Sequence, residues 1–366
     1  MDKPRLLFIV PLPPPVHGSA MVSQHMKDSR LIRESFHCDF VNLSTSRNLD
    51  EIGKRSPMKI FRFIHAYWHV FFKLMVHRYD MCYLAITCHG IGFLKDAPFV
   101  LLCKSLGRNV VIHQHNKGMN RYAGRFPFKW LLRLVYDETK VILLSWKLYP
   151  DIEKIVSKEH VWICPNGIPD VFFDVQENVM HQSIPQLLFL SNLAESKGVY
   201  VLLDACKMLR EMGVAFTCHL VGAESKEISR RNLEKEITRR GLDGIVQYHG
   251  PQYGKDKERF FQEADIFVQP TFEDCFPLTI LEAMQHGLPV VATSEGAIPD
   301  MVVHGETGYV CDPKNASQLA EYLIKLLNNS ELRQQMGKSG CCRYKEMFTL
   351  EAFERNLQGI LSDMLN

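Results

Sequence analysis

The segment Pro270–Gly287, with the sequence PTFEDCFPLTILEAMQHG, combines carboxylates with the start of a helix. The apolar run Ile266–Gln269 predicts a buried strand that leads into it, and the helix is expected to have Pro277 at its first position and to end before Gly287. A helix start at the carboxyl end of a parallel strand presents unpaired backbone N–H groups, which suit a diphosphate. Glu282 on this helix could accept hydrogen bonds from sugar or ribose hydroxyls; the alternative is a solvated glutamate on an exposed face. The core side of the helix is expected to consist of Ile280, Leu281 and Met284.

The segment Pro270–Gly287 must be positioned by strands and helices, which the sequence indicates as short apolar runs that alternate with helical segments. In the first half, buried strands are expected over Leu6–Val10, Met81–Ile86, Asn109–His113, Val141–Leu144 and Val161–Cys164. In the second half, they are expected over Leu187–Leu190, Phe216–Val221, Ile245–His249, Ile266–Gln269, Pro289–Ala292 and Gly308–Val310. This alternation predicts two similar α/β halves, each with a parallel sheet, joined by a polar linker over 170–185. A last amphipathic helix is predicted over Leu350–Leu365, with an apolar face of Phe353, Leu357, Ile360, Leu361 and Met364.

Bulk composition limits the class of protein. The chain has 366 residues, enough for about two domains, and 46% of them are hydrophobic, which excludes a disordered chain. Residues 1–180 contain 24 Lys and Arg against 16 Asp and Glu, a net charge of +8, and residues 181–366 contain 19 against 25, a net charge of −6. The basic half is expected to meet an anionic partner, a phosphorylated substrate or a membrane surface rather than nucleic acid, because no nucleic-acid motif is present.

Cysteine usage and apolar runs indicate the compartment. The 11 cysteines are scattered, with no Cys-x-x-Cys pair, and are expected to be reduced thiols in a cytoplasmic protein. The first apolar run, Leu6–Val10, is too short for a signal peptide, and no apolar run approaches the length that spans a bilayer.

A helical segment over Ile60–Val76 has two interpretations. Its polar residues recur at spacings of three and four on an otherwise apolar helix: Arg62, His65, His69 and Lys73. The first interpretation is a helix packed on the sheet with a narrow wet face. The second is a basic amphipathic helix that lies on an anionic membrane.

The segment 274–291 resembles the C-terminal signature of retaining glycosyltransferases of family 4. The matching residues are Asp274, Glu282 after seven intervening residues, Ala283, and the run Gly287-Leu-Pro-Val-Val291. Further similarity lies in Pro165–Ile168, Gly222, Glu295–Asp300 and Gly305–Val310. The resemblance extends over nearly the whole chain and is strongest over 187–312.

The resemblance implies the GT-B fold, an α/β architecture of two Rossmann-like domains whose parallel sheets face each other across a cleft. It implies an acceptor domain over 1–172, to which a C-terminal helix over 350–366 returns, and a nucleotide-sugar domain over 173–349. Two residues depart from the family pattern. Asp274 replaces a glutamate and has a shorter reach, and Asn192 replaces an arginine that helps to bind the diphosphate.

The resemblance also implies roles for individual residues. The catalytic set would be Asp274, Glu282, Lys197 and His115, with His113 as the second choice for the histidine and a structural role for both histidines as the alternative. The donor-binding set would be Gly18, Asn192, Lys197, Cys275, Phe276, Pro277, Leu278 and Glu282. No metal or cofactor is implied, since no Asp-x-Asp motif stands at a strand end and GT-B enzymes do not use one.

The function implied is retaining, metal-independent transfer of a sugar from a nucleotide sugar, UDP- or GDP-linked, to a hydroxyl. The acceptor would be a glycan or lipid-linked saccharide in bacterial cell-surface polysaccharide biosynthesis. The enzyme would be cytoplasmic or peripheral on the cytoplasmic face of the inner membrane. The alternatives are a catalytically weak sugar-nucleotide-binding protein of the same fold and a sugar-nucleotide epimerase.

Overall fold

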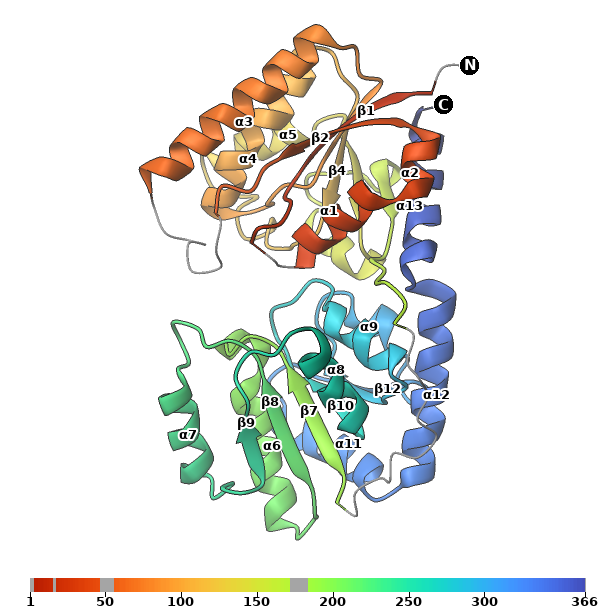
Figure 1. The fold of residues 1–366 in the computed structure, drawn as a ribbon. Coiled ribbons are helices and arrows are strands. Elements are labelled where there is room, and N and C mark those ends of the chain that lie inside the picture. The colour runs from red at the N-terminus through yellow and green to blue at the C-terminus, as the bar shows by residue number, and fades with distance from the viewer. Residues whose placement is uncertain (1–2, 16–17, 47–55, 172–183, 366) are drawn as a thin grey trace. The chain divides into compact units, whose positions relative to one another are not determined.

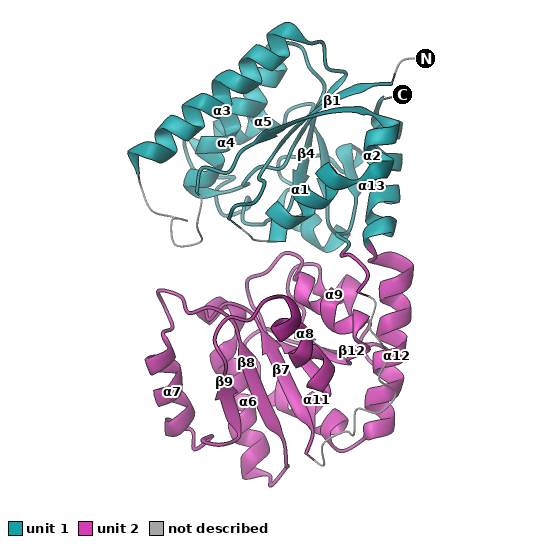
Figure 2. Ribbon diagram, in the orientation of Figure 1, with its two compact units in different colours: residues 1–167, 350–366 teal, residues 168–349 magenta. Residues whose placement is uncertain are grey.

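The computed structural model describes residues 3–15, 18–46, 56–171 and 184–365. The chain divides into two compact units, 1–167 with 350–366 and 168–349 (Figure 2). Most of the predicted linker, residues 172–183, lies outside the described residues.

Unit 1 is built on a parallel sheet of six strands in the order β2-β1-β3-β4-β5-β6 (Figure 1). The strands are β1 (Arg5–Val10), β2 (His37–Asn42), β3 (Met81–Leu84), β4 (Val110–Gln114), β5 (Lys140–Leu143) and β6 (Val161–Ile163). The α-helices are α1 (Gly18–Asp28), α2 (Arg30–Ser35), α3 (Pro57–Val76), α4 (Gly90–Ser105), α5 (Phe128–Tyr136) and α13 (Leu350–Leu365). Helices α3, α4 and α5 cover one face of the sheet, and α1, α2 and α13 lie on the other side (Figure 1). The predicted apolar face of α13 is buried throughout.

Strand β2 was not expected from the sequence. Its residues, HCDFVN, alternate polar and apolar types instead of forming an apolar run, and only Val41 is fully buried. It pairs in parallel with β1, from Arg5 beside His37 to Val10 beside Asn42. The strand lies at the edge of the sheet, where one side of the backbone has no neighbouring strand, so it does not need the apolar composition of the central strands.

Helix α3 turns part of its predicted polar stripe toward its own unit. Two stripe residues bond to their own unit: Arg62 donates from Nη1 to the Thr45 carbonyl at 2.7 Å, and Lys73 Nζ donates to Asp39 Oδ1 at 2.8 Å. The side chains that α3 exposes include its largest apolar ones, whereas only Ala66, Val70 and Leu74 are buried. Arg62 and Lys73 of the stripe thus bond within unit 1, whereas His65 and His69 are exposed beside the apolar side chains.

Unit 2 is built on a second parallel sheet of six strands, in the order β12-β11-β10-β7-β8-β9 (Figure 1). The strands are β7 (Gln186–Leu190), β8 (Thr217–Val221), β9 (Val246–Tyr248), β10 (Ile266–Gln269), β11 (Val290–Thr293) and β12 (Gly308–Cys311). The α-helices are α6 (Val199–Glu211), α7 (Arg230–Arg239), α8 (Gly254–Glu263), α9 (Leu278–Gln285), α10 (Ile298–Met301), α11 (Ala316–Leu327) and α12 (Ser330–Met347). The central strands are buried on both faces, as expected for a parallel sheet covered by helices.

The two strand orders are the two common doubly wound types. Unit 2 has the order of a dinucleotide-binding Rossmann sheet, with its change of direction between β7 and β10. Unit 1 has the flavodoxin-like order, with the change between β1 and β3. In such sheets ligands bind beyond the carboxyl ends of the strands at this point, so the topology assigns one candidate position to each unit.

Candidate functional site

In unit 2, the loops after β7 and β10 carry most of the residues that the sequence singled out. Lys197 ends a short 3-10 helix, Glu195–Lys197, that follows β7. Gly198 comes next in a left-handed conformation, and a Cβ atom there would lie 1.9 Å from the carbonyl oxygen of Pro270. Only glycine lets the two loops approach so closely. The Ser196 carbonyl then accepts hydrogen bonds from Phe272 N and Thr271 Oγ1.

The loop after β10 is held from its other side by the loop after β11. Gly296 has a φ of +56°, and a Cβ atom there would lie 2.5 Å from the Asp274 carbonyl oxygen. Ala297 donates from its backbone N–H to the Cys275 carbonyl at 2.9 Å, and Glu295 Oε1 accepts from the Asp274 N–H at 3.2 Å. The loop that carries Asp274 is therefore held on one side at Thr271 and Phe272 and on the other at Asp274 and Cys275.

Lys197 and Asp274 contact each other directly. Their Nζ and Oδ2 atoms are 2.6 Å apart, and the side chains are 25% and 17% exposed. Lys197 Nζ also donates to the Glu273 carbonyl at 3.2 Å. A pair so shielded from water interacts more strongly than an exposed one, yet both side chains still reach the surface. Two residues of the predicted catalytic set thus form one charged group at the change of direction of the sheet.

Helix α9 begins one residue later than predicted. Pro277 precedes the helix with an extended ψ of 109°, and the first helical residue is Leu278. The proline therefore takes the cap position instead of the first turn. Among the described residues, no side chain caps this start, and the first amides of a helix lack acceptors within the helix. The predicted end is confirmed, since Gly287 follows in a left-handed conformation with a φ of +69°.

Glu282 faces away from the core side of α9, which is formed as predicted by Ile280, Leu281 and Met284. Its Oε1 atom accepts from Lys257 Nζ of α8 at 2.8 Å, and the Glu282 side chain is 22% exposed. Its Oε2 atom is buried and accepts no hydrogen bond from the described residues. A buried carboxylate oxygen without a donor is costly, and a ligand hydroxyl would supply one.

The remaining predicted donor-binding residues of unit 2 differ in exposure. Asn192 follows β7 with an exposed side chain, and Cys275 and Leu278 are half-buried. The Phe276 ring is buried against Phe348, with ring centroids 6.1 Å apart, and Pro277 is buried as well. For these two residues, only the backbone can contribute to a ligand site.

In unit 1, the structure places two predicted residues at the carboxyl edge of the sheet. Gly18 is the first residue of α1, in the connection after β1. His115 directly follows β4, and both of its ring nitrogens are buried without a hydrogen bond to the described residues. Burial lowers the pKa of His115 to about 4, so the ring is neutral at neutral pH. His113 lies within β4 and bonds to the Tyr83 hydroxyl, which gives it a structural contact.

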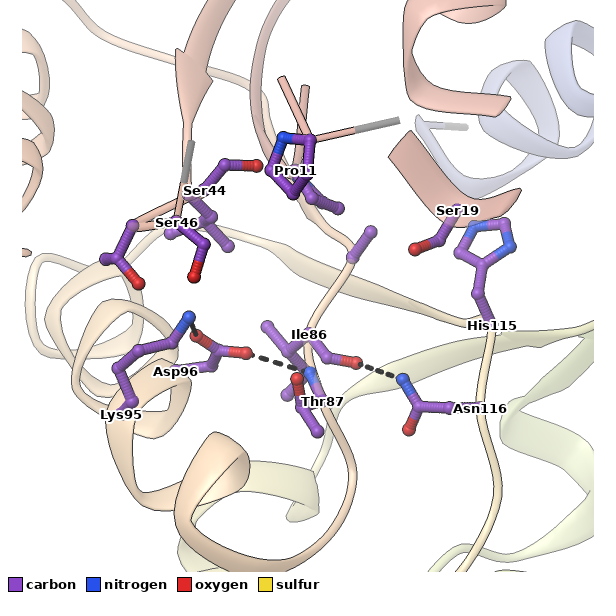
Figure 3. A pocket seen from close by; sticks show the side chains of 14 residues that line it. Pro11, Ser19, Ser44, Ser46, Ile86, Thr87, Lys95, Asp96, His115 and Asn116 are labelled. Atoms are coloured by element: carbon purple, nitrogen blue, oxygen red, sulfur yellow. Dashed lines mark hydrogen bonds and ion pairs between the residues drawn. The ribbon is translucent and has the colours of Figure 1, made fainter. Parts of the chain in front are cut away.

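A pocket of about 210 Å³ lies at the predicted position in unit 1. It is lined by residues that follow four neighbouring strands and by the start of two helices (Figure 3): Pro11, Pro15, Ser19, Leu43, Ser44, Thr45, Ser46, Ala85, Ile86, Thr87, Lys95, Asp96, His115 and Asn116. Asp96 Oδ2 accepts from Thr87 N at 2.9 Å, and its Oδ1 lies 3.2 Å from Lys95 Nζ. Hydroxyls, an amide, a charged pair and a neutral imidazole therefore share one cavity, a set suited to hydroxyl-bearing ligands.

Several of these residues were missed from the sequence. Asp96 had a signal, because it is an acidic residue within the otherwise apolar helix GIGFLKDAPFVLLCKS and is only 3% exposed. Lys257 had none, since it belongs to the charged run Gly254-Lys-Asp-Lys that is typical of a solvated surface. Among the described residues, no group of three or more His, Cys, Asp or Glu side chains is arranged to hold a metal ion.

Comparison with known proteins identifies the second unit. Residues 173–341 match the family described as Glycosyl transferases group 1. The matched residues include Lys197, Asp274 and Glu282, which confirms the resemblance at this level.

The relatives found by sequence include proteins named as glycosyltransferases. The amylovoran biosynthesis glycosyltransferase AmsK of Erwinia amylovora is 29% identical over 175 residues, which cover 46% of this chain and 42% of the relative. A D-inositol 3-phosphate glycosyltransferase of Corynebacterium aurimucosum is 28% identical over 245 residues, which cover 63% of this chain and 56% of the relative. The chain thus spans about half the length of these relatives.

The similarity of structure covers both units. Sucrose-phosphate synthase from Thermosynechococcus elongatus matches with a TM-score of 0.76 at 19% identity, over 99% of each chain. HepE of Anabaena in complex with UDP-glucose matches with a TM-score of 0.74 at 17% identity, over 98% of this chain and 99% of that one. At these identities the likeness shows the fold, and the predicted GT-B architecture is confirmed.

Proposed function

We propose that this protein is a retaining, metal-independent glycosyltransferase of family 4 that moves a sugar from a UDP- or GDP-sugar to a hydroxyl of a glycan or lipid-linked saccharide. The observation that carries the proposal is the Lys197–Asp274 pair beside the uncapped start of α9, within a group 1 domain. This arrangement offers a cation and backbone amides to a diphosphate at the point where a doubly wound sheet binds its ligand.

Each residue has a role that its surroundings support. Lys197 and the α9 amides stabilise the negative charge that grows on the departing diphosphate. Asp274 binds hydroxyls of the donor sugar, and the contacts that hold its loop on both sides keep it in place. Glu282 binds the ribose hydroxyls through Oε2, while Lys257 holds its other oxygen. A phosphate oxygen of the leaving group takes the proton of the acceptor hydroxyl, so no separate base is assigned.

The acceptor is assigned to unit 1. Its pocket offers Asp96, Lys95 and Asn116 to the hydroxyls of a saccharide, and neutral His115 can donate or accept a hydrogen bond there. The net charge of +8 over residues 1–180 suits an enzyme at the anionic cytoplasmic surface of a membrane, where lipid-linked saccharides are found. AmsK is named for the biosynthesis of amylovoran, which supports a role in polysaccharide assembly.

The test is incubation of the full chain with a panel of UDP-, GDP- and ADP-sugars, with detection of free nucleotide. We expect release from one of them, and we expect Lys197→Ala to abolish it and Glu282→Ala to reduce it at donor concentrations below KM. Lys207→Ala is the matched control, since this lysine lies on α6 in an exposed pair with Glu211. Release that is equal in all three variants would refute the proposed donor site. Conversion of the donor to a different nucleotide sugar without an acceptor would indicate an epimerase instead.

A further inference from the structure

Helix α3 exposes an unusual amount of apolar surface. Five of its side chains follow one another at spacings of three and four residues, and each is 47–67% exposed: Phe61, Ile64, Trp68, Phe72 and Met75. Met58, Ile60 and Val76 extend this face and are 55%, 63% and 69% exposed. We call these eight residues the α3 apolar face.

Exposed large apolar side chains are concentrated on the α3 apolar face and are not distributed evenly over the described part of the chain. Of the nineteen large apolar side chains that are exposed in the described part of the chain, eight are on α3, and five are spread over unit 2. The rings of Trp68, Phe71 and Phe72 also contact one another, with centroid distances of 5.4–5.9 Å. Isolated exposed apolar residues are ordinary, but a contiguous face of this kind marks a contact with another apolar phase.

The neighbouring helices add apolar and cationic groups to the same layer. Helix α4 contacts both α3 and α5, so the three helices form one layer over the sheet (Figure 1). Helix α5 exposes Trp130 and Leu134 together with Lys129 and Arg133. Neither α3 nor α5 contains an acidic residue. A partner surface must therefore accept apolar side chains and positive charge together.

We propose that the α3 apolar face inserts into the interfacial region of an anionic lipid membrane, with the cations of α5 meeting the headgroups. A bilayer offers acyl chains to apolar side chains and negative charge to Lys and Arg, and tryptophan favours the boundary between them. None of the described helices is long and apolar enough to cross a membrane, so α3 would lie along the surface. Arg62 and Lys73 contribute little to this contact, because both bond within unit 1, whereas the exposed His65 and His69 remain available to the headgroups.

This surface adjoins the pocket of unit 1. Arg62, in the second turn of α3, bonds to the carbonyl of Thr45, which lines the pocket. Helix α4 supplies Lys95 and Asp96 to the pocket and exposes Ile91 and Leu94 from the same first turns. Insertion of α3 would therefore bring the pocket to the lipid surface. If unit 1 binds the acceptor, as proposed above, this position favours a saccharide that is linked to a lipid.

The test is co-sedimentation of the full chain with vesicles of phosphatidylglycerol and phosphatidylcholine, compared with vesicles of phosphatidylcholine alone. We expect binding to the anionic vesicles. The triple variant Phe61→Ser, Trp68→Ser and Phe72→Ser should bind at least about tenfold more weakly, because three large apolar side chains no longer insert. The control is Met212→Ser with Tyr253→Ser, which removes similarly exposed apolar groups from unit 2 and should bind as the unchanged chain does.

A second measurement tests how deeply α3 inserts into the bilayer. Lipids brominated in the acyl chain should quench tryptophan fluorescence, and Trp68→Phe should lose most of that quenching. Equal vesicle binding by the triple variant and the unchanged chain would overturn the proposal. So would a dimer that only the triple variant abolishes, without vesicle binding, since the face would then be an interface between copies. Nucleotide release is measured in the same samples without acceptor, so failure of membrane binding is distinguished from failure of the proposed donor site.

Discussion

The two units use similar sheets but differ in the loops beyond their strands. In unit 2, the loops after β7 and β10 are pressed together at Gly198 and joined by the Lys197–Asp274 pair. In unit 1, the loops beyond four neighbouring strands enclose a pocket of about 210 Å³, and its outer helices expose apolar side chains. A doubly wound sheet fixes where a ligand binds, and the loops determine the chemistry that it meets.

The largest effect on activity is expected when the positive charge of Lys197 in unit 2 is removed. Lys197→Ala should lower the rate of nucleotide release by on the order of 100- to 1000-fold, because the growing charge on the diphosphate loses its nearest cation. The rate is measured with the donor at saturation. A loss of less than about threefold would show that charge stabilisation lies elsewhere.

Alanine substitutions at two glycines test the importance of the close approach between the loops after β7 and β10. Gly198→Ala should lower the free energy of unfolding of this unit by about 3 kcal/mol or more, because the added Cβ meets the Pro270 carbonyl. Gly213 has a similar φ of +73° with no atom within 4 Å of such a Cβ, so Gly213→Ala should cost only about 1 kcal/mol. Urea unfolding measures the free energy of unfolding of both variants. Equal losses would show that the left-handed backbone conformation alone, and not the close approach to Pro270, makes glycine necessary at Gly198.

The role of Glu282 predicts a change in binding and not in chemistry. Glu282→Gln should raise KM for the donor by about tenfold and leave kcat within about twofold, since the ribose is distant from the reacting bond. Steady-state kinetics with varied donor concentration separates the two constants. A fall in kcat at constant KM would assign Glu282 to the transition state instead.

The smallest expected effect concerns the buried imidazole of unit 1. The pKa of His115 is lowered to about 4 by burial, against about 6.5 in an unfolded chain, so the unfolded state binds more protons below pH 6.5. Its contribution to stability is complete above that pH and is lost as the pH falls toward 4, with about 1 kcal/mol gone by pH 5.5. His115→Gln should flatten this part of the pH dependence of urea unfolding. An unchanged slope would mean that His115 is accessible to protons in the folded state.

The sequence predicted the central strands because parallel strands covered by helices consist of apolar runs, as in Ile266–Gln269, whose bounds it gave correctly. It missed β2, because an edge strand can alternate polar and apolar residues. It also identified Gly287 as the end of α9 but placed the start one residue early.

Local sequence patterns could not predict contacts between segments that are far apart in the chain. Lys197 and Asp274 are 77 residues apart and were assigned to different groups of the donor, although they bond to each other. Glu282 was selected without its partner, Lys257, because a single lysine in a charged run carries no signal. The periodicity of α3 revealed a polar stripe but not that Arg62 and Lys73 bond within unit 1, since their partners, Thr45 and Asp39, lie outside the helix.

The central claim is that unit 2 binds the diphosphate of a nucleotide sugar at Lys197 and the start of α9. Titration calorimetry of the full chain with UDP and GDP tests it most directly. We expect that one of them binds, that Lys197→Ala weakens its affinity by about tenfold or more, and that Lys207→Ala leaves it unchanged. An affinity that is equal in all three proteins would contradict it.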